Sequence, residues 1–172
     1  MDVAVRLTDL PALHPRLLWE EMAAAAVAML SRSGATAPFL NDFSIENLPG
    51  FGSDFLQLAI DAAGVSSAQV TRVQRTHEVP RLAELAAIAI AGLGLSHAGR
   101  HEIRDVALRG TAADYLVDES NHLLEIAGRS RRKDFGSAWR QRHRRLTNRE
   151  GRGFYLCVVE FQTPAGRLAF LS

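Results

Sequence analysis

The spacing of apolar residues predicts different structures in the two halves of the chain. Apolar residues recur every three or four positions from Pro15 to Ser31, which predicts a helix there. Residues Gly34–Pro49 show no such period and are expected to form an irregular link. A second helix is predicted over Gly52–Ala63, and the alternation within Gln69–His77 predicts a short strand.

From Pro80 onward the pattern predicts one helix, then strands. Pro80 is expected to open the helix, because a proline at the first helical position loses no hydrogen bond. The run RLAELAAIAIAGLGL that follows is apolar almost all round, as in a buried helix. A basic helix is predicted from Asp134 to near Gly151. The predicted strands are Glu102–Arg109, Ala112–Asp118, His122–Arg129, Gly153–Gln162 and Arg167–Ser172.

This order of elements predicts an α/β fold in which a mixed β-sheet is flanked by helices on both faces. The chain has 172 residues and 47% apolar content, enough for one packed domain. Residues 80–172 are expected to form the core, and residues 1–79 a helical N-terminal region that packs on it. The single cysteine, Cys157, lies in an apolar run and is expected to be a buried, inert thiol.

Basic residues are concentrated in one segment of the chain. Arg129–Arg152 holds ten of the 20 Arg and Lys residues but only two acids, whereas the remainder carries ten basic and 17 acidic residues. A basic segment on an acidic body is typical of a protein with a localised anionic partner.

Two acids lie on neighbouring predicted strands. Asp114 stands at the head of one strand and Glu125, 11 residues later, in the middle of the next. With the helix–three strands–helix–strand order around them, residues 80–172 resemble the PD-(D/E)xK, or restriction-endonuclease-like, superfamily. The resemblance implies that Asp114 and Glu125 hold Mg²⁺, with Glu84 of the preceding helix as a further ligand. Mg²⁺ prefers such oxygen ligands and would serve in nucleic-acid hydrolysis.

The sequence departs from the superfamily pattern two residues after Glu125. Where the pattern has a lysine, this chain has Ala127, which can neither stabilise charge nor position a nucleophile. Arg129, on the same strand face as Glu125, or Lys133, the only lysine, are the candidate substitutes. We therefore expect a nuclease-like protein with a degenerate site that acts by binding or as a subunit of an assembly. An active Mg²⁺-dependent nuclease using Asp114, Glu125 and Arg129 is the alternative.

A structural explanation stands beside the catalytic one. Asp114 and Glu125 would form an ion-pair network with Arg109, Arg129 or Arg131 on an exposed hairpin. Burying both acids together without a cation is costly, so a buried pair would favour the metal site. Under the structural explanation, Glu84 would serve only to complement the helix dipole.

The basic helix has few internal acids to pair with its arginines. The candidate nucleic-acid contacts are therefore those projecting from it or preceding it, namely Arg131, Arg132, Lys133, Arg140, Arg144 and Arg145. A solvated helix face, or an interaction module that docks an acidic protein and no nucleic acid, would carry the same charges.

Other classes of function find no motif in the sequence. Zinc-binding spacings and a nucleophile elbow do not occur. The N-terminus lacks the pattern of a signal peptide, and Leu85–Gly99 is too short to span a membrane, so a cytoplasmic location is expected. The apolar N-terminal helix would cover the core or form a homo-oligomer contact.

Overall fold

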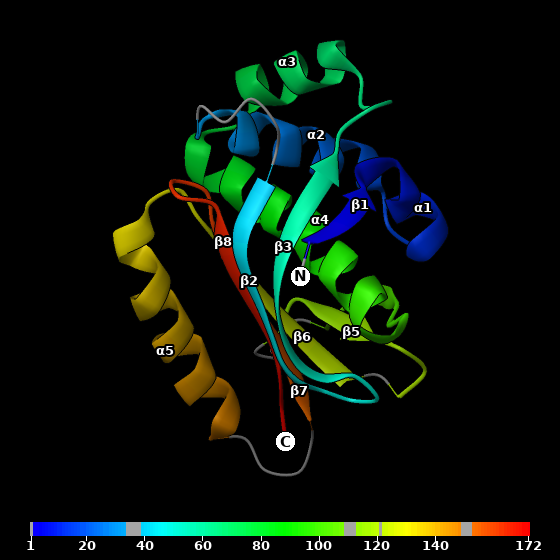
Figure 1. The fold of residues 1–172 in the computed structure, drawn as a ribbon, viewed down its shortest axis with the longest axis vertical. Helices are drawn as coiled ribbons and strands as arrows, with labels where there is room; N and C mark the ends of the chain where they lie inside the picture. The colour runs from blue at the N-terminus through cyan, green and yellow to red at the C-terminus, as the bar shows by residue number, and fades with distance from the viewer. Residues whose placement is uncertain (1, 34–38, 109–112, 121, 149–152) are drawn as a thin grey trace.

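The protein is a mixed α/β fold built on one eight-stranded sheet. A computed structural model describes residues 2–33, 39–108, 113–120, 122–148 and 153–172. The strand order is β1-β3-β2-β8-β7-β6-β5-β4 (Figure 1). The strands are β1 Asp2–Arg6, β2 Phe39–Leu48, β3 Gly52–Asp61, β4 Ile103–Val106, β5 Tyr115–Val117, β6 His122–Arg129, β7 Phe154–Glu160 and β8 Ala165–Leu171.

The sheet mixes parallel and antiparallel pairs. Strands β4, β5 and β6 form an antiparallel meander, and β7 runs parallel to β6. Strand β8 is antiparallel to β7 and parallel to β2. Strand β3 pairs antiparallel with β2 and parallel with β1. The parallel pairing of β2 with β8 joins the N-terminal strands to the C-terminal core in one sheet.

Helices lie on both faces of the sheet, as predicted. Helices α2 and α4 pack together on one face, and α5 lies on the other beside β6 and β7. The helical elements are η1 Leu7–Asp9, α1 Leu10–Leu13, α2 Trp19–Ser31, α3 Ser67–Thr76, α4 Val79–Gly99, η2 Arg132–Asp134 and α5 Phe135–Thr147.

Helix α4 is the central helix of the larger apolar core. It is buried along nearly its whole length because apolar residues surround it on all sides. By length and composition it resembles a membrane span, but 78% of its apolar stretch is buried inside the fold. The place of α4 in the core accounts for its apolar composition.

Three predictions in the first 79 residues are wrong. Gly34–Pro49 holds strand β2, and Gly52–Ala63 is strand β3 rather than a helix. In β3, alternate residues are buried, the period of a strand with one covered face. Gln69–His77 lies mostly in helix α3, whose N-terminus is capped by the Ser66 hydroxyl. Residues 1–79 therefore include three strands and are not a purely helical region.

The predictions after Pro80 hold for element type and order. The predicted helix at Pro80 is α4, and the His122–Arg129 strand is confirmed. Strands β4 and β5 are shorter than predicted, and the helix expected to end near Gly151 ends at Thr147. The ends of these predictions at Arg109, Ala112 and Gly151 lie outside the described residues. Cys157 is fully buried, and burial raises the pKa of its thiol, as expected for an inert cysteine.

Candidate functional site

The structure brings the three candidate acids into the lining of one pocket. Glu84 comes from α4, Asp114 from the residue before β5, and Glu125 from β6. The pocket has a volume of about 420 Å³ at the β4–β5 end of the sheet. The other lining residues are Arg81, Ile88, Val106, Ala107, Leu108, Ala113, Tyr115, Ile126 and Arg142.

Asp114 is fixed by the hairpin on which it stands. Its backbone N–H donates to the carbonyl of Leu124 at 2.9 Å, which continues the β5–β6 ladder by one residue. Its side-chain Oδ2 then accepts the N–H of Ile126 at 2.8 Å. One carboxylate oxygen of Asp114 is therefore used to satisfy the backbone of β6.

Glu84 reaches the pocket because α4 packs very closely on β6. A Cβ placed on Gly128 would lie 1.8 Å from the carbonyl oxygen of Ala83, so only a glycine permits this approach. The carboxylate of Glu84 is 55% exposed and pairs with Arg81 at 3.2 Å. Glu84 thus lies at the rim of the pocket, within an exposed ion pair.

Glu125 is buried and is held by two arginines of α5. Its side chain is 5% exposed, and Arg145 Nη2 donates a hydrogen bond to Oε1. Arg142 Nε lies 3.2 Å from the same oxygen but makes no hydrogen bond there, so charge attraction accounts for the contact. Arg142 was not among the candidate residues identified from the sequence.

The surroundings of Glu125 and Arg142 shift the pKa of each group. Burial, and then the nearby Asp114 carboxylate, raise the pKa of Glu125, whereas Arg145 and Arg142 oppose the rise. Burial and the nearby Arg129 lower the pKa of Arg142, which Glu125 partly offsets. A guanidinium stays charged under these conditions. The two arginines therefore supply the positive charge that a buried carboxylate requires.

The donor set as arranged does not fit a divalent metal ion. Glu125 is occupied by two guanidinium groups, and Asp114 gives one oxygen to the backbone. Across the described residues, no group of three His, Cys, Asp or Glu side chains is placed to hold a metal ion. A cation would have to displace Arg142 and Arg145 from Glu125.

The position of the missing lysine is closed. Ala127 is 2% exposed and belongs to a buried cluster with Ala138 and Trp139 of α5. Arg129, one candidate substitute, turns back and donates to the carbonyl of Gly128 at 2.7 Å. The other, Lys133, lies exposed on η2, and neither is among the described residues that line the pocket.

Glu125 does form an ion-pair network, as the structural explanation expected, but not with the arginines that were expected. Arg131 pairs with Asp134 at 3.2 Å, Arg129 binds backbone, and Arg109 lies outside the described residues. The partners of Glu125, Arg142 and Arg145, come from the basic helix instead.

The arginines of α5 lie on two flanks of the helix, and only one of these flanks is free of acidic partners in the described chain. Arg142 and Arg145 face Glu125, whereas Arg140 and Arg144 line a second hollow of about 360 Å³ with Trp139, His143 and Thr147. Before the helix, Arg131 pairs with Asp134, and Arg132 with the buried Glu160 at 3.4 Å. Arg140 and Arg144 are exposed and have no acid partner within the described chain.

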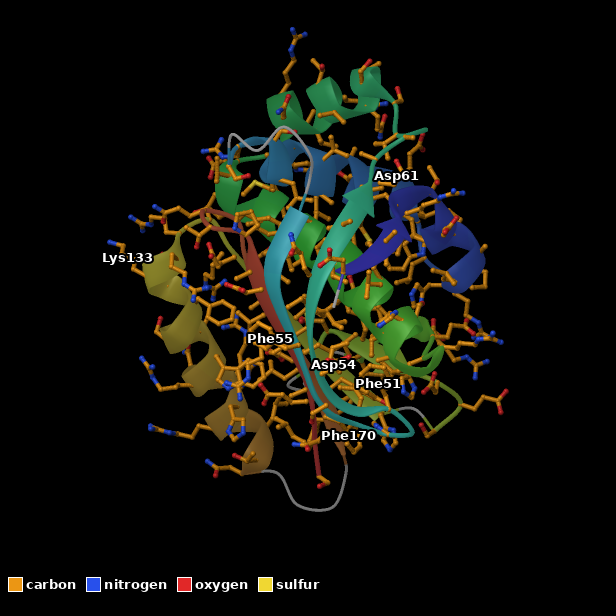
Figure 2. All side chains as sticks on the ribbon, viewed as in Figure 1. Phe51, Asp54, Phe55, Asp61, Lys133 and Phe170 are labelled. Atoms are coloured by element: carbon orange, nitrogen blue, oxygen red, sulfur yellow. The ribbon has the colours of Figure 1, made fainter. Side chains whose placement is uncertain are left out.

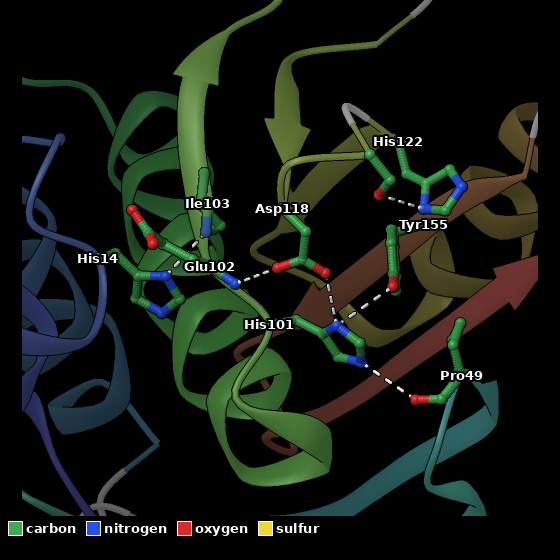
Figure 3. Close-up of polar contacts among 9 residues, drawn as sticks. His14, Pro49, His101, Glu102, Ile103, Asp118, His122 and Tyr155 are labelled. Atoms are coloured by element: carbon green, nitrogen blue, oxygen red, sulfur yellow. Dashed lines mark hydrogen bonds and ion pairs between the residues drawn. The ribbon is translucent and has the colours of Figure 1, made fainter.

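A buried histidine that sequence reasoning missed ties the N-terminal segment to the core. His14 is fully buried, and its Nδ1 accepts the N–H of Ile103 at 2.9 Å (Figure 3). Its Nε2 donates to the carbonyl of Gly92 at 2.9 Å. Burial lowers the pKa of His14. Both ring nitrogens are engaged with backbone, so this histidine has a structural role.

A second polar cluster joins two turns near the same end of the sheet. His101 Nδ1 lies 2.7 Å from a carboxylate oxygen of Asp118, and Nε2 lies 3.2 Å from the carbonyl oxygen of Pro49 (Figure 3). Asp118 also accepts the N–H of Glu102 at 2.7 Å. These groups hold the β2–β3 turn against the β5–β6 turn.

Comparison of the chain with protein-family models, with curated proteins and with solved structures found no match. The function is therefore inferred from the geometry of the two regions around α5.

Proposed function

We propose that this protein binds nucleic acid through helix α5 and does not cleave it, as a degenerate member of the restriction-endonuclease-like class. The observation that carries the proposal is the division of the arginines of α5. Arg142 and Arg145 neutralise the one buried carboxylate of the pocket, while Arg140 and Arg144 face outward without an acid partner in the described chain. Outward guanidinium groups of this kind suit phosphate oxygens.

The arrangement of the C-terminal core supports the structural half of the proposal. Helix α4, the antiparallel strands β4–β5–β6, helix α5 and the strand β7 parallel to β6 follow the order expected of that class. The two helices lie on opposite faces of the sheet. The loss of catalysis is supported by Ala127 beneath α5 and by the two arginines on Glu125.

Binding without metal tests the proposal. Fluorescence anisotropy with a labelled oligonucleotide in the presence of a chelator should give binding that weakens steeply as salt rises. Arg140→Glu with Arg144→Glu should weaken binding roughly tenfold or more. The matched control is Arg72→Glu with Arg75→Glu, two exposed arginines of α3, which should leave binding within about twofold. Equal losses in both double variants, or capture of acidic polypeptide in preference to oligonucleotide, would reject the proposal.

A Mg²⁺-dependent nuclease is the second candidate, favoured by the convergence of Glu84, Asp114 and Glu125 on one pocket. Incubation with single-stranded and plasmid DNA in Mg²⁺ or Mn²⁺ distinguishes the two functions. Cleavage that is abolished by Asp114→Asn would support the nuclease and contradict the non-cleaving function. The absence of cleavage by the wild type supports binding alone.

A further inference from the structure

Within the described residues, no helix covers the half of the α5 face of the sheet that β2 and β3 form. Helix α5 packs beside β6 and β7 on this face. In β3, Leu56, Leu58 and Ile60 are buried on the α4 side, while Phe55 and Gln57 face the other way. Figure 2 shows this side, with β2 and β3 in front of α4 and α5 beside them.

Phe55 lies on the same face of the sheet as α5. The guanidinium of Arg167 on β8 stacks over the Trp139 ring of α5, 3.9 Å from its centroid. Arg167 is the register partner of Ser44 on β2, and Ser44 is the register partner of Phe55 on β3. Register partners share a face, so the row runs from α5 across β8 and β2 to Phe55. Two strand spacings, about 10 Å, separate Phe55 from Arg167.

Phe55 is an exposed aromatic side chain on this row. It is 62% exposed, whereas aromatic side chains elsewhere in the core, such as Phe43 and Tyr155, are almost completely buried. An exposed ring on an open sheet offers a flat apolar surface to another flat ring.

The exposed side of α5 next to Trp139 carries the outward arginines. Arg140 and Arg144 are one helical turn apart, about 6 Å along the axis. They line the 360 Å³ hollow together with Trp139 and His143. None of the described residues that line this hollow is acidic, so it attracts anions.

The sheet between the two features is close to neutral. Glu46 on β2 is neutralised by Arg167 through two contacts of 2.7 Å. Ser44 and Gln57, next to Phe55, carry no charge, and Asp42 is the exposed acid farther along β2. Positive charge thus lies at one side of the surface and an aromatic ring at the other.

We propose that single-stranded nucleic acid crosses this surface, with phosphates on Arg140 and Arg144 and one base stacked on Phe55. This deepens the proposed function and rests on it. Unpaired bases expose the faces that a duplex keeps stacked inside, so a stacking residue beside a cationic helix selects single strands.

The experiment compares base-containing and abasic single strands of equal length by anisotropy. Phe55→Ala should weaken binding of the base-containing strand between about fivefold and a hundredfold, the range of one lost stacking contact. Phe55→Tyr, which keeps the ring, should bind as the wild type does. Leu18→Ala, at a 90% exposed apolar residue before α2, is the matched control and should have no effect.

The abasic strand separates stacking from charge. Wild type and Phe55→Ala should bind it equally, because it has no base to stack. Equal binding of the base-containing strand by wild type and Phe55→Ala would overturn this inference, even if Arg140→Glu with Arg144→Glu still weakened binding as the proposed function requires. Preference of the wild type for duplex over single strand would also overturn the inference alone. No binding to any oligonucleotide would overturn both.

Discussion

The two flanks of helix α5 use the same residue type for different purposes. On one flank, Arg142 and Arg145 turn toward the sheet and hold the buried Glu125. On the other, Arg140 and Arg144 project from the helix beside Trp139. The flanks differ because a buried carboxylate lies beneath the first, whereas Arg140 and Arg144 have no acid partner in the described chain.

The arginines of one basic helix thus divide into those that stabilise the fold and those that are free of this task. A buried carboxylate requires a cation, and in this pocket arginines from α5 provide it. The charge count of the helix therefore overstates the charge available to a ligand. Arginines without an internal partner are the ones to assign to binding.

The largest expected effect follows from replacing Arg142 and Arg145, the inner pair; Arg140 and Arg144 are the outer pair. Arg142→Gln with Arg145→Gln leaves Glu125 buried beside Asp114 without a cation, and should reduce the free energy of unfolding by about 2–3 kcal/mol. Arg140→Gln with Arg144→Gln should change it by less than about 0.5 kcal/mol. Urea denaturation measures both.

Addition of Glu125→Gln to the inner double variant should recover most of the lost stability, because the uncompensated charge is removed. Equal effects of the inner and outer pairs would show that the flanks do not differ energetically.

A lysine at position 127 tests whether the inner flank is closed. Ala127→Lys must fit beneath Ala138 and Trp139, and should cost about 2 kcal/mol of unfolding free energy. Gln141→Lys, on the exposed surface of the same helix, is the control and should be neutral. If Ala127→Lys were as stable as the wild type, the space beside Glu125 would be open to a catalytic cation.

A smaller effect concerns pH. The folded-state pKa of Glu125 is raised by burial and Asp114, so this group stabilises the fold at low pH and that contribution is lost as pH rises from about 4.5 through the folded-state pKa. The arginines oppose the rise. In Arg142→Gln with Arg145→Gln the pKa should rise further, so the stability deficit should be larger near pH 8 than near pH 5, by about 1 kcal/mol.

Denaturation midpoints measured at both pH values, with the Glu125→Gln triple variant as a control, check this. The triple variant has no carboxylate at position 125. The difference in stability between it and the wild type should therefore change with pH only through the titration of Glu125 in the wild type. A deficit that is constant with pH would contradict the assignment of the effect to Glu125.

The sequence allowed more of the C-terminal core to be predicted than of the N-terminal part. Helix α4 and strand β6 have strong, uninterrupted patterns. Strand β3 was mistaken for a helix because its apolar residues satisfy either period until the neighbouring strands are known. The apparent alternation of valines and arginines within Gln69–His77 predicts a strand where helix α3 forms. Val70 and Val73 are three apart, the spacing of one helix face, and both pack on the core.

For the site, the meeting of Asp114 with Glu125 was predictable from the hairpin, but the role of Arg142 was missed. A helical projection contains the signal: Arg142 and Arg145, three apart, fall on one flank, and Arg140 and Arg144, four apart, fall on the other. Which flank meets a carboxylate depends on how α5 lies on β6 and β7, which local sequence does not specify.

The salt dependence of single-strand binding tests the central claim most directly. Arg140→Gln with Arg144→Gln should lower the slope of log K against log salt by about 1.4, since each phosphate contact contributes about 0.7. Arg142→Gln with Arg145→Gln, measured in the Glu125→Gln background, should leave the slope unchanged. A slope lowered by the inner substitutions and unaffected by the outer ones would contradict the account.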